Sequence, residues 1–337
     1  MESHQASHAT MQVNSARALP SVRHLPIGFF GSVMSIAGLS LAWRLASKEY
    51  GVDIAVSNTA GMAAIVLFII LTLSYLGKSI MYPELVKHEY RHPVVGSFFG
   101  TVGISILLLS SVAGVYSAAA QLVIWTIGTV VTLALSVIMI SRLLNGSASP
   151  TSVAPSWLIA GVGSLDVVVT GGALTAEWTH EVSLLAAAIG SVSAIVFFVM
   201  IFSRLVHHEP LADAMRPSKM ILVAPFSVGF IAYVNLVQKV DMFAALLFYF
   251  ALFLFVIISC RLAVKPAPFS PAWWGIGFPM AALSNSALIY SHAVGGKGLG
   301  FIAALLLFLL TVSIVVLSVR TVYGLVAGLA AGRVVAA

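Results

Sequence analysis

The stretch LPIGFFGSVMSIAGLSLAWR, residues 25–44, contains a proline followed by an apolar segment rich in glycine and serine. Comparable apolar segments follow prolines along the chain, at intervals of 67, 62, 62 and 54 residues. Each interval can hold two membrane-spanning helices, because one such helix needs about 20 apolar residues. The recurrence therefore predicts five copies of a two-helix unit, starting at Pro26, Pro93, Pro155, Pro217 and Pro271.

The composition of the 337-residue chain is that of a membrane protein. Sixty per cent of its residues are hydrophobic and 8% are charged, and its mean hydropathy is +1.05, whereas soluble domains carry about 25% charged residues. We predict an all-α integral membrane fold of ten transmembrane helices, paired as five helical hairpins in a quasi-fivefold arrangement. The ten segments are 26–45, 57–80, 94–114, 117–141, 155–174, 183–205, 218–237, 241–263, 272–293 and 299–322.

The basic residues are distributed as these ten spans require. Thirteen of the 17 Lys and Arg residues lie near the termini or in loops after even-numbered segments. Because cytoplasmic loops are enriched in Lys and Arg, this asymmetry predicts a multi-pass protein of a bacterial-type inner (plasma) membrane with both termini cytoplasmic. We divide the chain into a disordered polar tail (1–23), a transmembrane pore domain (24–323) and a short C-terminal tail (324–337). The net charge of +6 then reflects topology and does not indicate a nucleic-acid partner.

Odd-numbered and even-numbered segments differ in the size of their side chains. Odd segments are rich in small residues, as in GVGSLDVVVTGG (161–172), whereas even segments are bulky, as in LLFYFALFLFVII (246–258). Small residues let helix backbones approach closely, so we expect odd helices inside, lining a central pore, and even helices outside. The alternative is a compact bundle without a pore, in which the small residues serve packing alone. Pro225 and Pro279 lie inside segments seven and nine and should kink them.

Two ionisable residues are candidates for a role in transport. Asp166 is the only residue of this kind well inside a predicted span, and such residues are functional candidates in a membrane. It could relay protons, or it could be neutral and hydrogen-bonded to nearby Ser or Thr hydroxyls. Arg44 lies at the outer end of the first segment, where it could snorkel to the interface or attract anions at a pore mouth.

Motifs for enzymatic chemistry are missing from the sequence. It contains no zinc-binding HExxH, no phosphate-binding Walker loop and no GxSxG nucleophile elbow. We therefore predict neither an enzyme nor a bound metal or cofactor. The single cysteine, Cys260, excludes a disulfide within the chain.

Phenylalanines recur in the inner segments and are candidates for a gate. Aromatic residues at helical spacing usually belong to a core, but a ring of them across a pore could form an apolar constriction that gates by dewetting. Phe278 is followed by Pro279, and a residue before proline is pushed away from helical geometry, so its side chain could sit at a bend. The candidate gate residues are Phe278, Phe30, Phe98 and Phe226.

Two segments carry a resemblance to a known family. LPIGFFGSVMSIAGLSLAWR (25–44) and WWGIGFPMAALSNSALIYSH (273–292) resemble the first and ninth helices of the superfamily of the bacterial tellurite-resistance protein TehA and the plant slow-type anion channels. The likeness covers about residues 24–323. It implies five hairpins around a central pore, a homotrimer with one pore per protomer, and permeation of anions. Through its FPM context, it also implies that Phe278 blocks the pore.

Three functions are compatible with these features. The leading hypothesis is a gated channel that conducts small anions through an uncharged axial pore plugged by Phe278. The alternative is a proton-coupled carrier of C4-dicarboxylate, sulfite or tellurite that uses Asp166, an acid by which this chain differs from the plant channels it resembles. The third is a non-conducting membrane scaffold or sensor.

Overall fold

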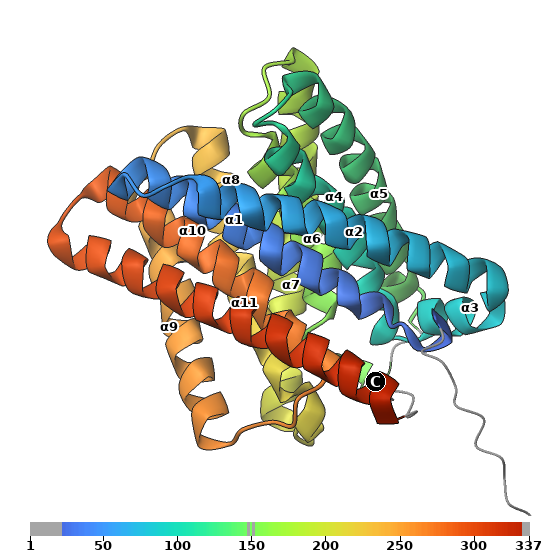
Figure 1. Cartoon of the computed structure of the whole chain (residues 1–337). Helices are drawn as coiled ribbons and strands as arrows, with labels where there is room; N and C mark the ends of the chain where they lie inside the picture. The colour runs from blue at the N-terminus through green and yellow to red at the C-terminus, as the bar shows by residue number, and fades with distance from the viewer. Residues whose placement is uncertain (1–21, 147–148, 150–151, 332–337) are drawn as a thin grey trace, which may run out of the picture.

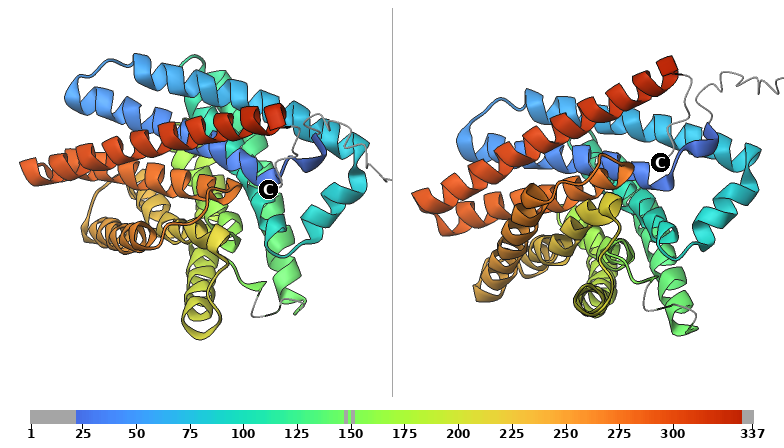
Figure 2. Two further views of the ribbon diagram at one scale, coloured as in Figure 1. Left: turned by 60° about the horizontal axis from the view of Figure 1, so that its bottom comes forward. Right: turned by 90° about the horizontal axis from the view of Figure 1, so that it is seen from below.

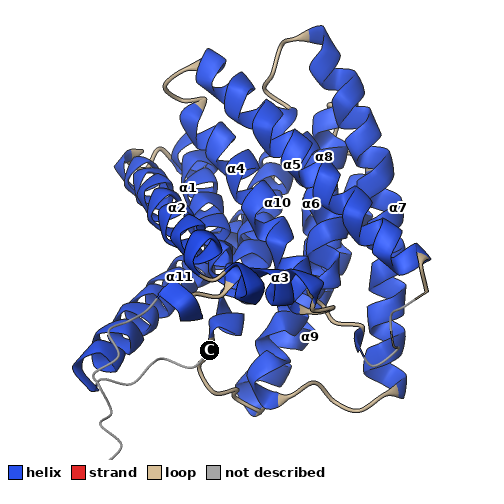
Figure 3. Cartoon of the chain, turned by 90° about the vertical axis from the view of Figure 1, so that its right-hand side faces the viewer, coloured by secondary structure: helices blue, strands red, loops and turns tan. Residues whose placement is uncertain are grey.

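All regular secondary structure in the described part of the chain is helical (Figures 1 and 3). The structure is a computed structural model that describes residues 22–146, 149 and 152–331. Its α-helices are α1 (Phe30–Tyr50), α2 (Ala55–Met81), α3 (Pro83–Arg91), α4 (Gly100–Ala113), α5 (Ala118–Leu144), α6 (Trp157–Gly171), α7 (Glu177–His207), α8 (Ala224–Val237), α9 (Met242–Val264), α10 (Gly277–Val294) and α11 (Lys297–Ala331). Its 3₁₀ helices are η1 (Val22–His24), η2 (Ile27–Phe29), η3 (Val95–Phe99), η5 (Asp213–Val223) and η6 (Pro271–Ile276).

Eight helical segments within these residues are long and apolar enough to cross a membrane. They match eight of the ten predicted segments, which confirms an all-helical, multi-pass membrane protein. The helices of the predicted fifth and ninth segments, α6 and α10, are not among the eight. Helix α6 has only 15 residues, which is short for a span. Both helices are buried along nearly their whole length, so protein rather than lipid surrounds them.

Burial separates the helices into an inner and an outer set. In the most apolar stretches of the spans that contain α1, α4 and α8, 61–67% of residues are buried, whereas the value is 22–33% for α2, α5, α7, α9 and α11. The inner set is therefore α1, α4, α6, α8 and α10. These are the helices of the odd-numbered segments, whose small residues predicted that they lie inside. Bulky residues of the outer set, such as Leu73, Ile195 and Phe301, remain exposed.

Each inner helix packs against the outer helix that follows it in the chain. The pairs are α1–α2, α4–α5, α6–α7, α8–α9 and α10–α11, and the last pair is seen in orange and red in both views of Figure 2. The inner helices also pack on one another in the order α1, α4, α6, α8, α10, and α10 packs on α1. Glycine permits the α1–α10 approach, because a Cβ on Gly38 would lie 2.6 Å from the Cβ of Ala281.

Local signals explain where several helices begin and end. Ser117 and Asp241 cap α5 and α9 by accepting hydrogen bonds from the backbone N–H groups three residues later, at 3.2 and 3.1 Å. The hydroxyl of Tyr233 donates a second hydrogen bond to Asp241, and this bond is the main cause that lowers the pKa of the Asp241 carboxyl. Helix α1 ends at Tyr50 and is followed by Gly51, whose φ of 67° is the left-handed conformation that glycine adopts readily.

The two prolines predicted to kink helices lie where a 3₁₀ segment passes directly into an α-helix. Pro225 is in the first turn of α8, directly after η5, and Pro279 is in the first turn of α10, directly after η6. Proline is tolerated there because the first N–H groups of an α-helix have no partner within the helix. Pro225 has no N–H to donate to the carbonyl of Ile221, and this carbonyl instead accepts a hydrogen bond from the N–H of Ala224.

The ends of the chain differ in how far the structure describes them. Helix α11 continues to Ala331, so the predicted C-terminal tail from residue 324 begins as an extension of that helix. The predicted N-terminal tail lies almost wholly outside the described residues. The short helix α3, between α2 and α4, was not predicted from the sequence.

Candidate functional site

A cavity of about 490 Å³ opens where the inner helices begin. All five inner segments contribute to its wall, because each begins next to one of the recurring prolines and these starts converge at one end of the bundle. The contributing side chains include Met34 near the start of α1, Phe98 and Thr101 around the start of α4, Ile159 of α6, Ile221 of η5 and Phe278 of α10.

The wall of this cavity is mostly apolar and carries no formal charge. None of the described residues that line it is Lys, Arg, Asp or Glu. Its polar side chains are engaged locally: Thr101 Oγ1 donates to the carbonyl of Phe98 at 2.6 Å. His92 Nδ1 accepts from the N–H groups of Val94 and Val95, each at 3.2 Å. An ion that enters would therefore lose water without meeting a fixed opposite charge.

Two of the four candidate gate residues share this cavity. Phe278 is 8% exposed and is held at the junction of η6 and α10, one residue before Pro279. Phe98 lies in η3, just before α4, and lines the same space. The structure thus brings together side chains that are 180 positions apart in the sequence.

The other two candidate phenylalanines lie elsewhere, so the predicted ring of four is not formed around this cavity. Phe30 is 3% exposed and packs edge-on against Phe68 and Tyr75 of α2, with ring centroids 5.8 and 6.4 Å apart. Phe226 packs between Phe198 of α7 and Phe250 of α9, at 5.0 and 4.5 Å. It lines a second cavity, of about 180 Å³, among α6, α7, α8 and α9.

Asp166 is buried in α6 without a partner for its carboxyl group. The residue is 1% exposed, and neither carboxyl oxygen has a hydrogen-bond partner among the described residues. The nearby hydroxyl of Thr170 donates to the backbone carbonyl of Asp166, not to its side chain. Asp166 lies seven residues after the cavity-lining Ile159, which places both on the same face of α6 about two turns apart.

Arg44 lies far from the cavity. It is 14 residues, or about 21 Å, beyond the start of α1. Its guanidinium Nη1 donates weakly to the carbonyl of Ser111 at 3.5 Å, and its Nε is buried with no hydrogen-bond partner in the described part of the chain. Arg44 therefore does not contribute to the site formed around Phe278.

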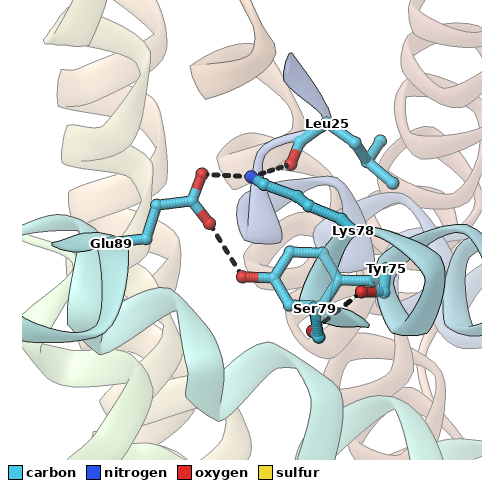
Figure 4. Close-up of polar contacts among 5 residues, drawn as sticks. All are labelled: Leu25, Tyr75, Lys78, Ser79 and Glu89. Atoms are coloured by element: carbon cyan, nitrogen blue, oxygen red, sulfur yellow. Dashed lines mark hydrogen bonds and ion pairs between the residues drawn. The ribbon is translucent and has the colours of Figure 1, made fainter. Parts of the chain in front are cut away.

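Sequence reasoning missed a buried ion pair beside the cavity (Figure 4). Lys78 of α2 is 1% exposed; its Nζ contacts Oε1 of Glu89 at 2.5 Å and donates to the carbonyl of Leu25 at 2.8 Å. The hydroxyl of Tyr75 donates to Oε2 of Glu89 at 2.7 Å. The network joins α2 and α3 to the residue before Pro26, which lines the cavity. The only local signal was the polar face of residues 83–91, where Glu89 lies.

These features define a multi-pass helical membrane protein whose inner helices enclose an uncharged cavity at one end of the bundle. The chain belongs to the family described as voltage-dependent anion channel, SLAC1, whose model matches residues 24–322. The match confirms the resemblance that the segments at 25–44 and 273–292 indicated.

Curated relatives include plant and bacterial proteins. The guard cell S-type anion channel SLAC1 of Arabidopsis thaliana is 27% identical over 90% of this chain and 56% of its own length. The S-type anion channel SLAH2 of the same plant is 26% identical over 82% of this chain and 54% of its own length. The tellurite resistance protein TehA homolog of Haemophilus influenzae is 28% identical over 83% of this chain and 85% of its own length. The chain thus spans about half the length of these two plant relatives.

Proposed function

We propose that this protein is a gated channel for small anions. In this proposal the five hairpins surround a quasi-fivefold axis, α6 and α10 complete a set of ten spans, and the inner helices line a central pore. Both termini are cytoplasmic in an inner membrane, and three copies form a homotrimer with one pore each. The observation that carries the proposal is the uncharged cavity to which all five inner segments contribute, with Phe278 in its wall.

The chemistry of the wall suggests how such a channel would select and gate. Without fixed cations along the path, selectivity would be weak and set by the free energy of removing water from the anion. Nitrate, which holds water less tightly, would then permeate better than chloride. Phe278, assisted by Phe98, would plug the path, since an apolar constriction gates by excluding water.

The test is whether anions carry the current. Purified Phe278→Ala protein in planar bilayers should show reversal potentials that follow a chloride or nitrate gradient, with nitrate more permeant. Replacing potassium with sodium on one side should leave the reversal potential unchanged. A reversal potential that follows the cation gradient would overturn the proposal of an anion channel.

The second candidate function is a proton-coupled carrier of C4-dicarboxylate, sulfite or tellurite. It is favoured by one observation, the buried Asp166 carboxyl without a hydrogen-bond partner. A carboxyl group in this position could bind a proton in one step of the cycle and release it in another.

The two candidates differ in their response to a proton gradient. If Asp166 couples transport to protons, an acidic exterior should drive anion uptake into liposomes, and Asp166→Asn should abolish that effect while keeping the protein folded. If the protein is a channel, flux should follow the anion gradient alone. Neither the wild type nor Asp166→Asn should then respond to the proton gradient. Radiolabelled anion uptake with and without a pH gradient makes this distinction.

A further inference from the structure

Four basic side chains from three elements gather at one end of the molecule. Arg204 is in the last turn of α7, Arg216 and Lys219 are on η5, and Arg261 is in the last turn of α9. All three arginines interact electrostatically with Lys219. The C-terminal ends of α7 and α9 lie at the same end of the bundle (Figure 1).

This cationic cluster lacks balancing negative charge. Arg216 pairs with Asp213, but Arg204, Lys219 and Arg261 form no ion pair with any residue that the structure describes. Nε and Nη1 of Arg204 are buried and have no hydrogen-bond partner within the same residues. Like charges held together in a partly buried place repel one another, so a bound anion would stabilise this arrangement.

The second cavity is an apolar groove between α7 and α9, which both pack on α8. Along α7, the rings of Phe202 and Phe198 lie between Arg204 and the second cavity, and Phe198 also packs on Phe226. The second cavity begins near Ile195, nine residues or about 14 Å from Arg204 along the helix. Ile195 and Phe202 are 64% and 51% exposed, so this face of α7, from the cluster to the groove, is open to the surroundings of the bundle.

We propose that this groove binds an anionic phospholipid. The phosphate contacts Arg204, Lys219 and Arg261, and one acyl chain lies along the phenylalanine rings into the 180 Å³ cavity. Guanidinium and ammonium groups bind phosphate through charge-assisted hydrogen bonds, and basic pockets between membrane helices are sites for anionic headgroups. The phenylalanine rings and the apolar groove beyond them favour a lipid over a free phosphate ion, because they match an acyl chain attached to the headgroup.

Native mass spectrometry of the full-length protein in detergent tests the proposal with phosphatidylglycerol as the probe. Lys219→Gln should weaken phosphatidylglycerol binding about tenfold, the change expected on losing one charge-assisted contact. It should also raise the thermal midpoint of the delipidated protein, because it removes like-charge repulsion. A misfolded variant would not show both changes. Lys87→Gln, at an exposed lysine paired with Glu84 on α3, is the matched control and should change neither quantity.

Further measurements distinguish a bound lipid from other occupants of the groove. Ile195→Trp, which narrows the groove at an exposed position, should weaken binding of phosphatidylglycerol and leave binding of glycerol 3-phosphate unchanged. Phosphatidylcholine, which has no net charge, should bind wild type at least tenfold more weakly than phosphatidylglycerol. The proposal is overturned if glycerol 3-phosphate binds as tightly as the lipid. It is also overturned if Ile195→Trp changes only the number of subunits, which would assign the groove to a second copy of the chain.

Discussion

Replacing Phe278 with alanine is expected to raise the anion current of the reconstituted protein at least about tenfold. The side chain lines the cavity at the start of α10 and is almost completely buried. Its ring would present an ion with an apolar surface where water must be shed. Lowering such a barrier by only about 1.4 kcal/mol increases a rate tenfold, and removing a whole phenyl ring from a constriction should exceed that value.

Phe226→Ala is the matched control for this experiment. Phe226 is also a phenylalanine beside a proline in an inner helix, but it packs between Phe198 and Phe250 on the outer side of α8. Its substitution should leave the current at the wild-type level. Phe98→Ala should give an intermediate increase, since Phe98 lines the same cavity as Phe278. An unchanged current in a monodisperse Phe278→Ala protein would refute the gate.

Glu89→Gln is expected to produce the largest loss of stability among the substitutions considered, about 3 kcal/mol. The substitution leaves the charge of Lys78 buried at 1% exposure without its carboxylate partner. Removal of one partner of a buried ion pair costs about 3–5 kcal/mol, and we expect the lower end because the Glu89 side chain is 21% exposed. Thermal unfolding followed by size-exclusion chromatography measures the loss as a lower midpoint.

A double-mutant cycle distinguishes the ion pair from general damage to α3. Lys78→Met removes the buried charge, so Lys78→Met combined with Glu89→Gln should be more stable than Glu89→Gln alone. Tyr75→Phe removes only the hydrogen bond to Glu89 Oε2 and should cost about 1 kcal/mol. Additive losses for Lys78→Met and Glu89→Gln would contradict an interaction between the two charges.

Much of the architecture could be predicted from composition and spacing. The recurring prolines mark where inner segments begin, and the contrast between small and bulky residues separates inner from outer helices, because lipid and protein neighbours favour different side chains. The 3₁₀ segments before α8 and α10 were not predictable with the same rules. Pro225 and Pro279 mark these places in the sequence, but the change from 3₁₀ to α-helix beside them is seen only in the structure. The Lys78–Glu89 pair was also missed, because it depends on how α3 folds back onto α2.

The sequence by itself determined that the chain is a helical membrane protein, which residues form its inner helices, and the family to which it belongs. Only the tertiary structure decided which inner-helix side chains share a cavity. Phe226 and Phe278 look alike in the sequence, since each adjoins a proline near the start of an inner helix. One residue turns a helix by about 100°, and α8 and α10 are apolar on most sides, so no sequence pattern reports which way either ring points. Packing against neighbouring helices sets that rotation, and it directs Phe278 to the cavity and Phe226 to the groove between α7 and α9.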